Sequence, residues 1–152
     1  MAGTAEEKEN TRAYTFRYSP NVSINYEIDG HGEVPLVFVH GFAASLVTWH
    51  DIRRLFPKDR FRLFLLDLKG FGFSSKPQDG GYSIFDQADI VIAFIKALGL
   101  SNTILIGHSF GGSIALQVAL KSTRDHNGSH IGKLIVLNSA AYPQQLPLLM
   151  RI

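Results

Sequence analysis

Apolar and polar positions divide this chain into two kinds of extended segment. In residues 14–18 and 22–28 apolar and polar side chains alternate, and Asp29-Gly30 closes the second segment with a turn. Such alternation predicts an antiparallel pair of strands at a sheet edge. The other segments are short and mostly apolar, which is typical of strands covered on both faces. They comprise residues 35–39, 61–66, 103–106 and 133–137.

Two helical segments lie between these strands. Apolar residues recur at helical spacing across residues 83–98, where Ser83 and Asp86 form a capping-box pattern and Gly99 marks the stop. The stripe predicted to face inward is Ala88, Val91, Ile92, Ile95 and Leu98. A second helix is predicted over residues 109–121. Strands that alternate with helices predict an α/β fold with a mostly parallel sheet and helices on both faces.

Composition adds limits to this picture. The 152 residues are 45% apolar and 18% charged, as expected for one soluble globular domain. The formal net charge of +2 does not indicate a nucleic-acid partner, and the lack of cysteine removes disulfides and thiolate metal sites. The sequence has neither a secretory signal pattern nor the roughly 18 apolar residues in a row that a membrane span needs. We therefore expect a cytoplasmic protein with no membrane span, no metal and no cofactor.

The segment after residues 103–106 carries the first chemical motif, because ligands of parallel sheets bind beyond the carboxyl ends of the strands. It reads Gly-His-Ser-Phe-Gly-Gly at residues 107–112, a G-x-S-x-G pattern between a strand and a helix. In a nucleophile elbow the glycines permit a tight turn that lifts the serine, here Ser109, to a helix N-terminus that favours developing negative charge. The alternative is a serine that only caps the helix, and the motif alone does not decide between them.

Two further motifs follow other strands of the predicted sheet. His-Gly-Phe occupies residues 40–42 after the third strand, and Asp-Leu-Lys-Gly-Phe-Gly-Phe-Ser occupies residues 67–74 after the fourth. With the elbow after the fifth strand, this order of motifs resembles the serine hydrolase branch of the α/β-hydrolase superfamily. The resemblance covers about residues 14–141.

The resemblance implies roles for three residues. Ser109 would be the nucleophile, and the backbone N–H groups of Phe42 and Phe110 would form an oxyanion hole for a tetrahedral intermediate. The two phenylalanine rings would favour a small-molecule acyl substrate with an apolar part. Epoxide hydrolases and haloalkane dehalogenases of this superfamily place an aspartate at the elbow, so the serine disfavours both. Asp67 is interpreted as structural, holding the turn after its strand through local hydrogen bonds.

A base and an acid that could complete a triad with Ser109 are not identified. The superfamily order is Ser, then Asp or Glu, then His, and the residues available are Asp125, His126 and His130. A helix of about 12 residues would carry the chain roughly 18 Å from the elbow before they occur, and the next parallel strand starts at the opposite sheet edge. We interpret them as part of a solvated loop. His40 and His108 are interpreted as structural.

The resemblance implies an α/β-hydrolase fold that is truncated after about its sixth strand. Residues 1–12 are expected to fray, residues 13–142 to form the N-terminal part of the core, and residues 143–152 to begin a cap or linker. The triad acid and histidine would then be missing from the chain, which by itself would be weakly active at most. Its uncovered sixth strand is expected to favour self-association through the sheet edge.

The predicted function is a serine hydrolase of the carboxylic-ester type, esterase-like, that forms an acyl-enzyme on Ser109. Two alternatives remain open. One is a non-catalytic hydrolase-like binding or receptor protein, which an unreactive Ser109 would reveal. The other is an acyltransferase or perhydrolase, which products formed with competing acyl acceptors would reveal.

Overall fold

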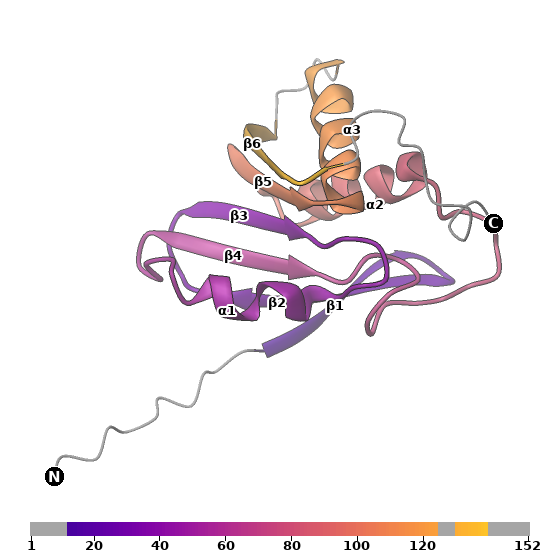
Figure 1. The fold of residues 1–152 in the computed structure, drawn as a ribbon, viewed down its shortest axis with the longest axis horizontal. Coiled ribbons are helices and arrows are strands. Elements are labelled where there is room, and N and C mark those ends of the chain that lie inside the picture. The colour runs from indigo at the N-terminus through magenta and orange to yellow at the C-terminus, as the bar shows by residue number, and fades with distance from the viewer. Residues whose placement is uncertain (1–11, 125–129, 140–152) are drawn as a thin grey trace, which may run out of the picture.

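The computed structural model describes residues 12–124 and 130–139. Within them, six strands form one sheet in the order β1-β2-β4-β3-β5-β6 (Figure 1). The strands are β1 (Arg12–Ser19), β2 (Val22–Asp29), β3 (Val34–Val39), β4 (Phe61–Leu66), β5 (Thr103–His108) and β6 (Ile131–Leu137). The helical elements are the 3-10 turn η1 (Leu46–Trp49), α1 (His50–Arg53), α2 (Ile84–Ala97) and α3 (Phe110–Arg124).

The sheet has an antiparallel edge and a parallel remainder, as the sequence predicted. β1 pairs with β2 and β2 with β4 in antiparallel register, whereas β3 lies between β4 and β5 and is parallel to both. β6 continues the parallel part beside β5. The carboxyl ends of β3, β4 and β5 therefore meet at one edge of the sheet, and all three sequence motifs follow those ends.

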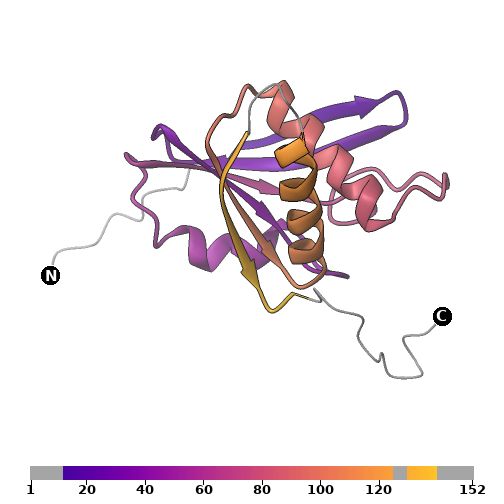
Figure 2. The same cartoon turned by 90° about the horizontal axis from the view of Figure 1, so that it is seen from above.

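Helical elements cover both faces of the sheet (Figure 2). In β3, Leu36 and Phe38 point to the face covered by η1, where they pack with Leu46 and Trp49. Their neighbours Val37 and Val39 point to the opposite face, covered by α2 and α3. This alternation explains why β3 reads as continuously apolar, since both of its faces are buried. The predicted α/β fold with helices on both faces is confirmed.

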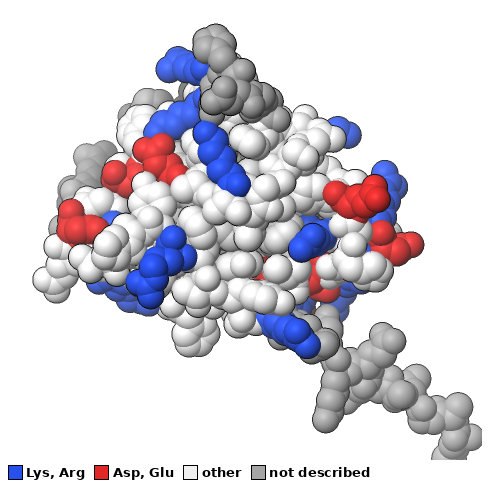
Figure 3. Space-filling view, turned by 180° about the vertical axis from the view of Figure 1, so that it is seen from behind, with Lys and Arg blue, Asp and Glu red and all other residues white. Residues whose placement is uncertain are grey.

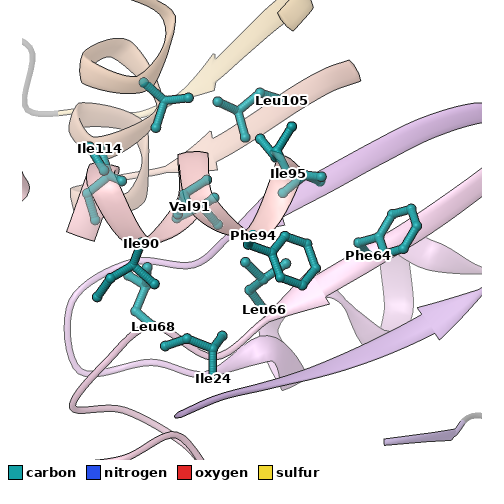
Figure 4. Close-up of a cluster of buried hydrophobic side chains, with 14 of the residues drawn as sticks. Ile24, Phe64, Leu66, Leu68, Ile90, Val91, Phe94, Ile95, Leu105 and Ile114 are labelled. Atoms are coloured by element: carbon teal, nitrogen blue, oxygen red, sulfur yellow. The ribbon is translucent and has the colours of Figure 1, made fainter. Parts of the chain in front are cut away.

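Helix α2 supplies much of the larger core (Figure 4). Its capping box is present, because the Ser83 side chain accepts from the Asp86 N–H and the Asp86 carboxylate accepts from the Ser83 N–H. The buried stripe differs from the predicted one: Ile90 and Phe94 are buried, while Leu98 is exposed. Leu98 is the C-cap residue, so it lies where the helix leaves the sheet.

The predicted boundary at the start of the core differs slightly from the observed start of β1. β1 begins at Arg12, which pairs with Ile28 and therefore belongs to the sheet and not to the polar segment 1–12. The other residues of that segment and the predicted cap segment 143–152 lie outside the described residues. In β6, the side chains of Ile135, Val136 and Leu137 are exposed, and self-association through this edge stays a prediction.

The surface carries charges of both signs. On the face seen from behind, basic and acidic side chains are interspersed around a largely uncharged middle (Figure 3). Among the described residues, no helix combines the length and apolar character needed to cross a membrane.

Candidate active site

Ser109 occupies the sharp turn between β5 and α3. Its φ angle is 53°, a left-handed conformation that costs a non-glycine residue on the order of 1–3 kcal/mol and persists only where the surroundings enforce it. Those surroundings include a hydrogen bond from the Ser109 N–H to the Leu137 carbonyl, 2.9 Å long, which ties the turn to the end of β6. The Ser109 carbonyl accepts from the Gly112 N–H, also at 2.9 Å, in the first turn of α3. The turn has the form expected of a nucleophile elbow.

Glycines let three segments approach each other around this turn. A Cβ on Gly107 would lie 2.4 Å from the Gly111 carbonyl oxygen, and a Cβ on Gly111 would lie 2.3 Å from the Val39 carbonyl oxygen. The loop after β3 also comes near, although less tightly, since a Cβ on Gly41 would be 3.3 Å from the Cβ of Ser109. The glycines of the motif are therefore required by packing of backbone on backbone, and they bring the residues 40–42 motif against Ser109.

The predicted oxyanion residues Phe42 and Phe110 lie together beside Ser109. Their ring centroids are 6.1 Å apart with an edge-to-face arrangement. Phe42 is 70% exposed, so its ring is available to a ligand at the surface. The structure thus groups Phe42, Phe110 and Ser109 as the sequence predicted, and the use of the two backbone N–H groups as oxyanion donors stays a prediction.

Phe71 is a further residue of this site, and the sequence motifs did not predict its role. Its ring centroid is 5.7 Å from that of Phe42 and 5.6 Å from that of His40, edge to face in both cases. Phe71 stands between Gly70 and Gly72, both with positive φ. An aromatic residue between two glycines in a motif after a strand could have indicated a ring near the site, but its contact with Phe42 depends on the neighbouring strand.

His40 is buried beneath the loop that carries Phe42. The Leu68 N–H donates to His40 Nε2 at 3.0 Å, and His40 Nδ1 lies 2.8 Å from the Gly41 carbonyl oxygen. A carbonyl only accepts and a backbone N–H only donates, so both bonds require the neutral ring with its proton on Nδ1. Burial lowers the pKa of His40 below the ordinary 6.5, against smaller opposing effects of the Gly41 carbonyl and the Asp67 carboxylate. His40 is structural, as predicted.

His108 precedes Ser109 directly, yet its side chain is on another face. It follows Ile104 and Ile106 in the alternation of β5, and both of these pack against the η1 side of the sheet. There the His108 ring meets Trp49 edge to face, with centroids 6.4 Å apart. In the described residues no hydrogen bond joins His108 to Ser109, although both lie near the Cβ position of Gly41, His108 Nδ1 at 3.2 Å and the Ser109 Cβ at 3.3 Å.

The described histidine that follows Ser109 in the sequence is not near enough to act as its base. His130 directly precedes β6, and its carbonyl accepts from the Thr103 N–H at the start of β5. It therefore lies at the amino edge of the parallel strands, the opposite edge to Ser109, as the sequence predicted. Asp125 and His126 lie outside the described residues. In the ranges 12–124 and 130–139, no group of three or more His, Cys, Asp or Glu side chains is placed to hold a metal ion.

Asp67 links several segments below the site. Its carboxylate accepts from the Phe73 N–H at 2.9 Å, which is the local turn bond that the sequence predicted. It also accepts from the Leu46 N–H at 2.8 Å and from Asn25 Nδ2 at 2.9 Å. These two bonds reach the end of the loop after β3 and strand β2, so Asp67 fixes the position of that loop as well as its own turn.

Acid is expected to destabilise this site through His40. The folded state holds the ring neutral and lowers its pKa, whereas the unfolded chain protonates near the ordinary 6.5. Stability is then fully present above about pH 6.5 and falls as the pH drops through and below that value, because the unfolded state binds the extra proton. Urea unfolding followed between pH 8 and 5 measures this slope. His40→Asn, which does not titrate, should flatten it, and an unchanged slope in that variant would contradict the assignment.

Known proteins resemble this chain in sequence. Residues 34–152 match the protein family that is described as "alpha/beta hydrolase fold". The "AB hydrolase superfamily protein YisY" of Bacillus subtilis (strain 168) is 37% identical over 121 residues, which are 80% of this chain and 43% of that protein. The chain thus spans less than half the length of this curated relative.

Solved structures resemble the fold as well. The esterase EaEST from Exiguobacterium antarcticum superposes with a TM-score of 0.70 at 32% identity, over 79% of this chain and 42% of the esterase. The epoxide hydrolase CorEH superposes with a TM-score of 0.76 at 25% identity, over 91% of this chain and 47% of that enzyme.

Proposed function

This chain belongs to the α/β-hydrolase family, and on that premise we propose that Ser109 is the nucleophile of a serine hydrolase acting on an ester or related acyl substrate. One observation carries the proposal: Ser109 holds a positive φ at a strand-to-helix turn, with the backbone of Gly41 packed beside it. A serine that served only as a helix cap would not need a strained conformation, since cap residues adopt the extended region.

The reaction proceeds by transfer of the acyl group to Ser109 and then to water. Ser109 Oγ attacks the acyl carbonyl carbon, a base takes the hydroxyl proton, and the carbonyl oxygen becomes an oxyanion that the N–H groups of Phe42 and Phe110 stabilise. Collapse breaks the bond to the alcohol, which leaves with the proton from the base. Water repeats the steps on the acyl-enzyme and releases the acid. Within the described residues neither His40 nor His108 makes a hydrogen bond to Ser109, so we assign the base to another residue of the whole protein.

The aromatic side chains beside Ser109 support an apolar substrate. The rings of Phe42, Phe71 and Phe110 form a continuous edge-to-face series, and apolar surface of this kind gains about 25 cal/mol for each Å² that a ligand covers. The proposed substrate is therefore a small molecule with an apolar acyl or alkyl part. The esterase EaEST among the structural relatives fits this class of reaction, and the serine at the elbow favours it over epoxide opening.

Covalent labelling tests the proposal directly. We expect a fluorophosphonate probe to modify the full-length protein that carries this chain, and mass spectrometry to locate the adduct on Ser109. The same protein should hydrolyse p-nitrophenyl butyrate. An unlabelled Ser109 in folded protein would favour a binding role, and an acyl product formed only with an acceptor other than water would favour an acyltransferase.

A further inference from the structure

His40 links the loop after β3 to the loop after β4 through both nitrogens of its ring. It is completely buried, with 0% of its surface exposed. Nδ1–H donates to the Gly41 carbonyl, the residue directly before Phe42, and Nε2 accepts from the Leu68 N–H. Phe71 closes the third side of the ring by edge-to-face contact. The imidazole is therefore held in one orientation and one tautomer.

The bond to the Gly41 carbonyl determines the direction of the next N–H group. Gly41 C=O and Phe42 N–H belong to the same planar trans peptide, in which the two groups point in opposite directions. A carbonyl drawn toward the buried ring leaves the Phe42 N–H pointing away from it. Gly41 also lies beside Ser109, since its Cβ position is 3.3 Å from the Ser109 Cβ, so the orientation of this peptide matters at the nucleophile.

We propose that His40 is a positioning residue that orients the Gly41–Phe42 peptide as an oxyanion donor through its Nδ1–H. This inference rests on the proposed function of Ser109 and assigns a residue that the mechanism itself does not use. Burial favours the neutral ring, whereas the Asp67 carboxylate, a charged group among the described residues, favours the protonated ring. A protonated His40 ring would have no acceptor for the Leu68 N–H, so the two hydrogen bonds require a neutral ring.

Two isosteric variants separate the two hydrogen bonds. In His40→Asn the side-chain amide can replace Nδ1–H and donate to the Gly41 carbonyl, whereas in His40→Gln the side-chain carbonyl can replace Nε2 and accept from the Leu68 N–H. Removal of one oxyanion donor costs roughly 10²–10³ in kcat. We expect His40→Gln to lower kcat for p-nitrophenyl butyrate at least about tenfold with little change in KM, and His40→Asn to restore most of that loss.

Control variants distinguish this proposal from the proposed function and from a general loss of structure. His130→Gln alters a histidine that also contacts a carbonyl, that of Leu100, at the amino edge of the sheet, and should leave kcat unchanged. Thermal melting of each variant separates stability from positioning. Two results would show that the positioning role is wrong while Ser109 remains the nucleophile. In both, Ser109→Ala abolishes activity; in one the two His40 variants lose kcat equally, and in the other neither His40 variant loses kcat. If Ser109→Ala retains activity, the proposed function itself is wrong.

The tautomer provides a readout that needs no activity. Long-range proton–nitrogen NMR spectra of ¹⁵N-histidine-labelled protein distinguish the Nδ1–H, Nε2–H and charged rings. For His40 we expect the neutral Nδ1–H form at pH 7. A charged ring or the Nε2–H tautomer would overturn the proposal even if no His40 variant folds.

Discussion

Ser109→Ala should lower ester hydrolysis by the full-length protein by roughly 10³ or more and remove fluorophosphonate labelling. The hydroxyl is the atom that forms the acyl bond, and alanine leaves only the background catalysis of the oxyanion donors and of binding. Alanine also adds no bulk at this strained turn, so the fold should persist. The measurements are kcat/KM for p-nitrophenyl butyrate and the circular dichroism melting curve.

Ser113→Ala is the matched control for this prediction. Ser113 lies one helical turn further along α3, and its Oγ is 3.4 Å from the Ser139 Oγ. Loss of this weak contact should leave kcat/KM within about twofold of the parent protein. Equal loss of activity in the two variants, or full activity in Ser109→Ala, would exclude Ser109 as the nucleophile.

Gly111→Ala should destabilise the fold by about 3 kcal/mol or more, at the upper end of what overpacking costs. The new Cβ would lie 2.3 Å from the Val39 carbonyl oxygen and 2.4 Å from that of His40. The Val39 carbonyl cannot move freely, since Val39 ends a strand that is paired with both β4 and β5. Helix α3 would have to shift away from the sheet. Urea unfolding gives the free energy, and the melting temperature should fall by roughly 10 °C.

Gly99→Ala is a control at a glycine whose backbone conformation is strained but whose surroundings are open. Gly99 has a φ of +61°, and a Cβ there would meet no atom within 4 Å. Its substitution should cost only the conformational penalty of about 1 kcal/mol. If the two variants are equally stable, close approach of α3 to β3 is not what requires glycine at position 111.

Local sequence patterns were sufficient to predict the strands and helices but not to predict every buried side chain. Alternation and apolar runs located the strands, and the Ser83–Asp86 capping box located the start of α2, because these signals depend on neighbours along the chain. The inward stripe of α2 was less well predicted. Phe94 is buried because it meets the rings of Phe16, Tyr26 and Phe64 edge to face, and these rings come from three different strands.

At the candidate site, too, some features were predictable from the sequence and others depended on tertiary contacts. The sequence by itself determined the order of the three motifs after β3, β4 and β5, the elbow at Ser109 and the grouping of Phe42 with Phe110, since parallel strands bring their carboxyl ends to one edge. Only the tertiary structure decided that Phe71 joins these rings, that Asp67 reaches the Leu46 N–H, and that His40 is neutral with its proton on Nδ1. These features depend on hydrogen bonds and ring contacts between segments some 20 to 30 positions apart, and such pairings arise only when the sheet sets β3 beside β4.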